Sequence, residues 1–160
     1  MISGILLFPP LWLLNTAALH NYAKTPTTGI YSQGTDKLPL PPQKRPSGAI
    51  NASSNDLKRY ALEVIAKYGL DLKKAKEMEA TITCESNWNS LAFNKGGNSY
   101  GVCQFQPATF RRYCMGDYKN PYDQVQCMAA MFLFGYEDQW DCWCMKYGKD
   151  VKSCDRVKKQ

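Results

Sequence analysis

The sequence predicts a mainly helical domain that is cross-linked by disulfides and carries a small loop or β-hairpin. Three observations lead to this fold class. Within residues 54–160, apolar residues recur at intervals of three and four, which is the spacing of amphipathic helices. Gly, Pro and Asn stand where those periodic segments should begin or end. All seven cysteines lie between Cys84 and Cys154, inside this same part of the chain.

Two helices are predicted at the start of the folded part. The first runs from about Ser54 to Tyr68, and Gly69 follows where a left-handed residue commonly ends a helix. The second runs over residues 72–87. The core face of the first helix would carry Leu57, Ala61, Val64, Ile65 and Tyr68.

The later elements follow from turn residues and helix-start signals. Residues 93–106 contain three glycines and predict an irregular loop or a small β-hairpin. A short helix is expected over residues 107–113, because proline fits the first turn of a helix. Residues 120–123, Asn-Pro-Tyr-Asp, are typical of another helix start, with Asn as the cap and Asp near the positive helix end. A last helix is predicted over residues 137–147, with Gly148 as its stop.

Composition divides the chain into three parts. Residues 1–23 begin with an apolar run and predict a secretory signal peptide or a membrane anchor, although no Lys or Arg precedes the run as in a standard signal. Residues 24–53, rich in Thr, Ser, Gly and Pro, predict an extended linker. The folded domain is expected to occupy residues 54–160.

The cysteines favour a disulfide framework over a metal site. The closest pair, Cys142 and Cys144, is separated by one residue rather than by the two of a zinc knuckle, and the single His20 lies far upstream. We therefore expect no metal and no cofactor. Disulfides also indicate an extracytoplasmic location.

The spacing of the cysteines does not fix their pairing. An odd number leaves at least one free thiol or an intermolecular bridge. The pairs we consider are Cys114 with Cys127, and Cys84 with Cys142 or Cys144. The latter bridge would tie the second predicted helix to the last one.

The charge and the aromatic residues narrow the classes of partner. The net charge of +6 favours anionic surroundings such as a bacterial wall. The Lys and Arg residues are scattered and form no basic helix beside an aromatic platform, which argues against a nucleic-acid partner. The 4 Trp, 10 Tyr and 6 Phe suit a well-packed core or stacking surfaces for sugars.

The most informative single residue is Glu85. Together with Ala75, Met78 and Ile82 it follows the spacing of one helix face, and the other three are apolar. A carboxyl group carried into apolar surroundings loses hydration, which raises its pKa and keeps it protonated near neutral pH. A protonated carboxyl can act as a general acid. The alternative is a glutamate at a frayed helix end that is exposed to water or paired with a lysine.

The residues around Glu85 carry a resemblance to a known family. Glu85-Ser86-Asn87-Trp88-Asn89 is followed by residues 94–110, NKGGNSYGVCQFQPATF. This order of a helix-ending Glu-Ser, a Ser-x-Gly loop, a Gln and a Pro-x-Thr-hydrophobic helix start resembles the soluble lytic transglycosylases, which are lysozyme-like. The resemblance spans about residues 54–147. It implies a lysozyme-like helical fold and cleavage of the β-1,4 bond between N-acetylmuramic acid and N-acetylglucosamine in peptidoglycan.

The resemblance also implies roles for individual residues. Glu85 matches the catalytic acid and base of the family, and Ser86 the residue that supports this Glu and its helix end. Gln104 matches the family's cleft glutamine, a hydrogen-bond partner of the saccharide or of the active site. The loop expected to approach the substrate carries Ser99, Tyr100 and Gly101.

One departure from the family concerns a tyrosine. Many relatives end with Tyr-Asn-Ala-Gly, whose tyrosine contacts the catalytic carboxylate. Tyr147-Gly148 is the nearest equivalent here and lacks the Asn-Ala. Tyr147 is therefore a candidate substrate-site residue, with Tyr136, Tyr113 or no tyrosine as alternatives, or simply a residue that packs at a helix end.

The number of acids decides the expected reaction. Glycosidases that use water normally employ two carboxylates. The acids near the motif, Asp117 and Asp123, have structural explanations in a turn and at a helix start. A single acid favours the transglycosylase route, in which Glu85 donates a proton and then takes one from the sugar's 6-hydroxyl to close a 1,6-anhydro ring. The alternatives are a lysozyme-type hydrolase (muramidase), a catalytically inactive glycan-binding envelope module and a cysteine-stapled structural protein.

A cellular location and binding partners follow from these expectations. We expect a secreted or cell-envelope protein that acts on peptidoglycan glycan strands. It would also contact a membrane if residues 1–23 are an anchor.

Overall fold

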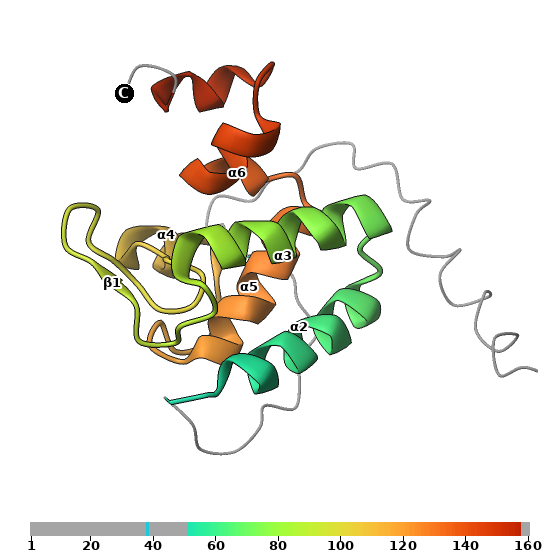
Figure 1. The fold of residues 1–160 in the computed structure, drawn as a ribbon, viewed down its shortest axis with the longest axis vertical. Helices are drawn as coiled ribbons and strands as arrows, with labels where there is room; N and C mark the ends of the chain where they lie inside the picture. Colours follow the sequence, from blue (N-terminus) through green and yellow to red (C-terminus); the bar gives the residue numbers. More distant parts are fainter. Residues whose placement is uncertain (1–37, 39–50, 158–160) are drawn as a thin grey trace, which may run out of the picture. The chain divides into compact units, whose positions relative to one another are not determined.

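The computed structural model describes Leu38 and residues 51–157, and within them the protein is mainly helical (Figure 1). The elements are, in order, α2 (Ser54–Tyr68), α3 (Leu72–Ser86), β1 (Phe93–Asn94), β2 (Ser99–Tyr100), α4 (Pro107–Tyr113), α5 (Pro121–Leu133), η1 (Glu137–Gln139), α6 (Asp141–Tyr147) and η2 (Lys152–Arg156), where η marks a 3₁₀ helix. Among these residues there is no helix that could serve as a membrane span.

The two N-terminal predictions fall largely outside the described residues. The signal peptide or anchor over residues 1–23 lies outside them entirely. Of the predicted linker, residues 24–53, only Leu38 and residues 51–53 are described. Leu38 is buried in the core, and its N–H donates to the carbonyl of Tyr113 (3.1 Å). At least this residue of the linker is therefore packed against the folded domain.

The first two helices are capped by residues next to them in sequence, and of these caps Gly69 was predicted. The side chain of Ser53 accepts a hydrogen bond from Asp56 N at the start of α2, and Gly69 ends that helix with φ 67°. Asp71 caps α3 by accepting from Lys74 N. The second helix was predicted over residues 72–87, and Asn87 forms its left-handed C-cap with φ 50°.

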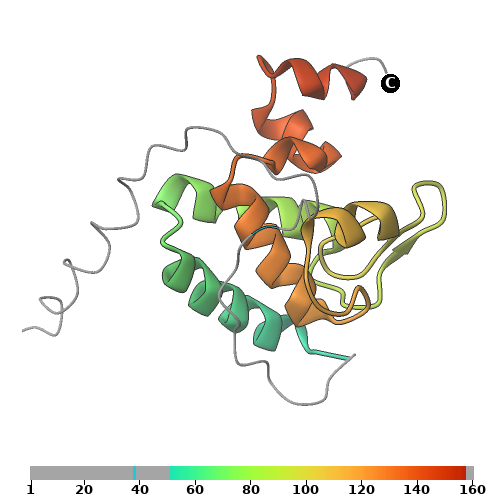
Figure 2. The same ribbon diagram turned by 180° about the vertical axis from the view of Figure 1, so that it is seen from behind.

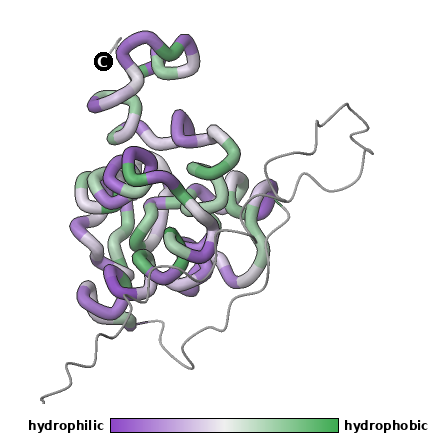
Figure 3. The backbone as a smooth tube through the Cα atoms, turned by 90° about the vertical axis from the view of Figure 1, so that its right-hand side faces the viewer, coloured by the Kyte–Doolittle hydropathy of each residue, from purple (hydrophilic) through white to green (hydrophobic). Residues whose placement is uncertain are grey.

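Helix α5 forms the centre of the core. Figures 1 and 2 show it running between α2 and α3, and its side chains from Tyr122 to Phe132 are nearly all buried. Asn120 caps the helix by accepting from Tyr122 N (2.9 Å). Burial of each large apolar side chain here contributes about 1.5–3 kcal/mol. Figure 3 shows hydrophobic and hydrophilic residues alternating along the helices, as helices with one buried face require.

Residues 93–106 form the small hairpin that the sequence allowed for. Strands β1 and β2 are antiparallel, with Phe93 opposite Tyr100 and Asn94 opposite Ser99. The two acids near the motif, Asp117 and Asp123, stabilise the turn before α5 through a hydrogen bond. The buried Asp123 carboxylate accepts from Asp117 N (2.7 Å).

The prediction of one continuous helix over residues 137–147 is wrong. The 3₁₀ helix η1 ends at Gln139, and α6 begins at Asp141 after an extended Trp140 (φ −103°, ψ 129°). The buried indole of Trp140 donates from Nε1 to the carbonyl of Cys103 (2.8 Å) and packs against the Phe105 and Phe132 rings. These core contacts account for the break in the helix.

Six of the seven cysteines form three disulfides. The predicted pair Cys114–Cys127 is confirmed, and of the two alternatives for Cys84 the partner is Cys142. A third bond, Cys144–Cys154, joins α6 to η2 and was not predicted. Cys103 is the free thiol and is buried. The Cys84–Cys142 bond links the end of α3 to the start of α6.

Candidate functional site

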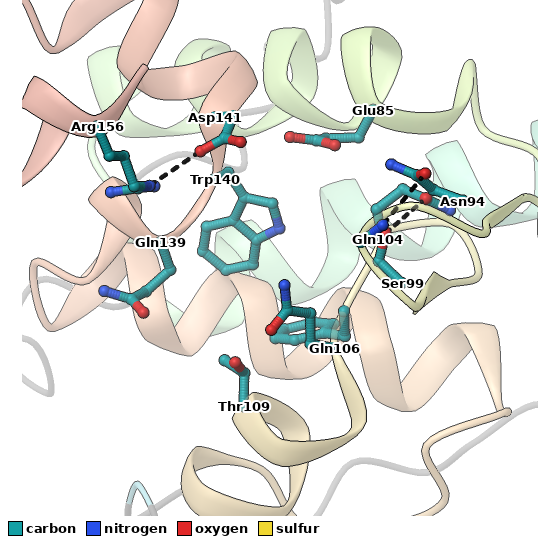
Figure 4. Close-up of a pocket in the computed structure, with 12 residues that line it drawn as sticks. Glu85, Asn94, Ser99, Gln104, Gln106, Thr109, Gln139, Trp140, Asp141 and Arg156 are labelled. Atoms are coloured by element: carbon teal, nitrogen blue, oxygen red, sulfur yellow. Dashed lines mark hydrogen bonds and ion pairs between the residues drawn. The ribbon is translucent and has the colours of Figure 1, made fainter. Parts of the chain in front are cut away.

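A cavity of about 510 Å³ lies where the end of α3 meets the hairpin, the start of α4 and the segment from η1 to η2 (Figure 4). Glu85 reaches it from α3, Ser99 and Gln104 from the hairpin and its loop, and Asp141 and Arg156 from α6 and η2. Most of its lining groups are polar, and the buried Trp140 adds an apolar ring. The cavity therefore combines carboxyl groups with amide and hydroxyl groups on one surface.

Glu85 is half-buried at the wall of this cavity, beyond the fully buried Met78 and Ile82 of the same helix. Burial raises the pKa of its carboxyl group. The N–H of Cys142, which donates to Oε1 (3.2 Å), opposes this effect, and the nearby charge of Asp141 adds to it. The carboxyl group thus retains its proton at a higher pH than an exposed glutamate would.

The raised pKa of Glu85 predicts a pH-dependent stability. The folded protein binds this proton more tightly than the unfolded chain does. The wild type therefore loses stability, relative to Glu85→Gln, as pH rises from the ordinary glutamate pKa to the higher pKa of the folded state. Thermal unfolding of both proteins between pH 4 and 8 measures this. A difference in unfolding free energy that stays constant with pH would contradict it.

Asp141 is a second carboxylate in the cavity, and it was not predicted from the sequence. It is the first residue of α6, and its Oδ1 accepts from Arg156 Nε (3.0 Å). The acids close to the motif in sequence, Asp117 and Asp123, do not line the cavity. The pairing of Cys84 with Cys142 is the signal that would have found it, because Glu85 and Asp141 are the chain neighbours of these cysteines.

Ser99 and Gln104 both line the cavity, and they also hold the hairpin loop together. Ser99 Oγ donates to Gln104 Oε1 (3.0 Å). Gln104 Nε2 donates to the carbonyls of Ala92 (3.1 Å) and Gly101 (2.9 Å). These bonds support the left-handed backbone of Gln104 (φ 50°). The amide implied by the resemblance as a saccharide contact is thus already engaged within its own loop.

Tyr100 and Gly101 do not line the cavity, and a different contact explains the glycine. Gly101 has φ 83°, and a Cβ at this position would lie 2.3 Å from Gln124 Nε2. Gln124 is fully buried; its Oε1 accepts from Cys103 N, and its Nε2 donates to the carbonyls of Tyr100 and Tyr118. The close approach that requires glycine is therefore to Gln124 of α5. The available signal for Gln124 was a polar residue at helical spacing from Met128 and Met131, on the apolar face of α5.

Ser86 and Tyr147 also lie outside the lining of this cavity. Ser86 Oγ donates to the carbonyl of Val102 (2.6 Å) and so ties the end of α3 to the hairpin loop. Tyr147 packs against Trp143, with ring centroids 6.2 Å apart, and lines a different cavity. The alternative tyrosines, Tyr113 and Tyr136, pack against each other. The structure thus brings none of these three tyrosines to the cavity of Glu85.

The arrangement suits acid–base chemistry on a polar, hydroxyl-rich ligand. Glu85 can supply a proton, Asp141 supplies negative charge, and the side chains of Asn94, Gln106 and Gln139 offer both donors and acceptors. Within residues 51–157 and Leu38, no group of three or more His, Cys, Asp or Glu residues is placed to hold a metal ion. The chain matches no protein-family model, no curated protein and no solved structure with which it was compared.

Proposed function

We propose that this protein is a peptidoglycan-cleaving enzyme with a lysozyme-like fold, and that Glu85 is its proton donor. The bond cut would be the β-1,4 linkage between N-acetylmuramic acid and N-acetylglucosamine. The observation that carries the proposal is a half-buried glutamate with a raised pKa at the wall of a polar cavity. The order of motif residues from Glu85 to Phe110 adds the resemblance to lytic transglycosylases.

Proton donation by Glu85 is the first step of the proposed reaction. Glycosidic oxygens are weakly basic, so cleavage near neutral pH needs an acid that remains protonated there. Glu85 gives its proton to the bridging oxygen, the bond between this oxygen and the anomeric carbon breaks, and the sugar becomes cationic. The amides of Asn94, Gln106 and Gln139 are available to bind the hydroxyl and acetamido groups of the strand.

The second step returns the proton to Glu85. As a carboxylate it removes the proton of the sugar's own 6-hydroxyl, whose oxygen then bonds to the anomeric carbon. The product is a 1,6-anhydro sugar, no water is consumed, and Glu85 is protonated again. This transglycosylase route needs one residue that acts first as an acid and then as a base.

A lysozyme-type hydrolase is the second candidate, and the position of Asp141 favours it. Asp141 lines the same cavity as Glu85, and glycosidases that use water employ two carboxylates. The sequence favoured the transglycosylase partly because a second acid was not identified. The nature of the product therefore separates the two routes.

The three disulfides are consistent with an extracytoplasmic location. We propose that the protein is secreted or held at the cell envelope, where peptidoglycan strands are accessible.

Digestion of purified peptidoglycan by the full chain, followed by mass spectrometry of the soluble products, tests this function. We expect disaccharide-peptides lighter by one water than the hydrolysed form, which indicates the anhydro ring. Products with a free reducing end would show that the bond is hydrolysed, and the proposed reaction would then be that of a hydrolase. Binding to the wall without release of fragments would contradict the proposed enzymatic activity and would favour a glycan-binding module.

A further inference from the structure

Glu85 and Asp141 are held near each other by a disulfide and a hydrogen bond that involve their neighbours in sequence. They come from different helices, α3 and α6, and Figure 4 shows the carboxyl group of Glu85 pointing toward Asp141, which is bonded on its other side to Arg156. The disulfide Cys84–Cys142 joins the residues next to them in sequence, with Cα atoms 6.0 Å apart. The N–H of Cys142 also donates to Glu85 Oε1. The fold therefore fixes one acid relative to the other.

Arg156 orients the second acid and is itself well anchored. Besides its bond to Asp141, Arg156 donates from Nη1 to the carbonyl of Ser153 (2.7 Å) and from Nη2 to the carbonyl of Asp138 (2.6 Å). The disulfide Cys144–Cys154 attaches η2, which carries Arg156, to α6. The guanidinium group therefore has little freedom to turn away from Asp141.

The charges around Glu85 are few and can be named. Among the residues that line the cavity, the titratable ones are Glu85, Asp141 of α6 and Arg156 of η2, while the hairpin contributes the neutral Asn94, Ser99 and Gln104. The buried thiol of Cys103 lies within electrostatic reach of Glu85, and burial raises its pKa well above the ordinary range, so it stays neutral. Once Glu85 has given up its proton, the lining carries two carboxylates and one guanidinium group, so its net charge is negative.

We propose that Asp141 is a catalytic carboxylate of this site, which stabilises the positive charge formed on the sugar when Glu85 protonates the bridging oxygen. This inference rests on the proposed function. The electron pair of the broken bond goes to the departing oxygen, and the charge spreads over the anomeric carbon and the ring oxygen. Asp141 forms no bond in this step and supplies a fixed negative charge. The same role serves either route, anhydro-ring closure or hydrolysis.

The ion pair between Asp141 and Arg156 is expected to contribute little to the stability of the fold. The side chain of Asp141 is 56% exposed and that of Arg156 is 42% exposed, and ion pairs this exposed contribute little to stability. The variant Asp141→Asn, which keeps the shape of the side chain, should therefore fold normally. Its effect on catalysis can then be measured without interference from unfolding.

The test compares Asp141→Asn with Asp150→Asn, which alters an exposed acid that lies outside this cavity. We expect Asp141→Asn to lower kcat for release of peptidoglycan fragments by about 10²-fold with a much smaller change in KM. The high-pH limb of its rate profile should move to lower pH, because Glu85 loses a neighbouring negative charge that helps it retain its proton. Asp150→Asn should behave as the wild type.

A second variant distinguishes a catalytic from a structural role. Asp141→Gly leaves space for a small carboxylate, so added formate should restore cleavage in proportion to its concentration. Wild-type kcat and an unshifted pH limb in Asp141→Asn would overturn the proposal, as would a loss in Asp141→Gly that formate does not repair. If the proposed function itself were wrong, the wild type would release no peptidoglycan fragments. This outcome differs from a failure of the proposal for Asp141 alone.

Discussion

Replacing Glu85 by glutamine is expected to lower the rate of peptidoglycan cleavage by roughly 10²- to 10⁴-fold, the range typical of a lost general acid. The amide has nearly the same shape and can still accept the hydrogen bond from Cys142 N through its oxygen. It carries no transferable proton of suitable acidity, so the bridging oxygen would leave unprotonated. Initial rates of fragment release from purified peptidoglycan measure the effect.

A matched control for this variant lies six residues earlier on the same helix. Glu79 is exposed on α3 and does not line the cavity, so Glu79→Gln should cleave at the wild-type rate. Circular dichroism should show both variants folded. If Glu85→Gln were folded and as active as the wild type, the proton donor would have to be another group.

Replacing Gln124 by leucine is expected to destabilise the protein by about 3 kcal/mol or more, because each buried polar group left without a partner costs about 1–3 kcal/mol. Gln124 is fully buried in α5, and its side chain satisfies Cys103 N and the carbonyls of Tyr100 and Tyr118. Leucine can form none of these three hydrogen bonds. Equilibrium urea unfolding measures the loss.

The neighbouring Gln126 provides the comparison. It is only partly buried on the same helix, and its Oε1 accepts from the hydroxyl of Tyr60 at 3.3 Å. Gln126→Leu should therefore cost clearly less than Gln124→Leu. Equal losses in unfolding free energy would indicate that the buried amide of Gln124 is not what holds the hairpin loop to α5.

The parts of the fold that the sequence predicted well depend on local interactions. Helix α2 begins and ends as expected because Ser53 caps one end through Asp56 N and Gly69 adopts the left-handed conformation at the other. The start of α5 at Asn120 follows the same logic. Caps and turns are set by residues three or four positions apart, so periodicity and residue type suffice to locate them.

The features that were predicted wrongly depend on contacts between residues far apart in the sequence. The break at Trp140 arises from a bond to Cys103 and from packing on Phe105, which no local pattern reveals. Gly101 was assigned to the substrate because its partner, Gln124, lies 23 positions later in the chain. Short-range periodicity carries no information on such pairs.

The candidate site was predicted in part. Of the residues proposed from the motif, Glu85, Ser99 and Gln104 line one cavity, since a helix end and the hairpin after it stay close in space. Asp141 stands 56 positions after Glu85 and reaches the cavity only through the packing of α6 on α3. Recognising it required the pairing of Cys84 with Cys142, which the spacing alone left open between two alternatives.

The three disulfides differ in how accessible they are to solvent. Cys84 is exposed, whereas both cysteines of the Cys114–Cys127 and Cys144–Cys154 bonds are buried. A small thiol would therefore reach the Cys84–Cys142 bond first, because exchange requires access to the sulfur atoms. Opening that bond would free the start of α6 from α3 while the remaining cross-links stayed closed. The placement of Asp141 relative to Glu85 would then depend on noncovalent contacts such as the hydrogen bond from Cys142 N to Glu85 Oε1.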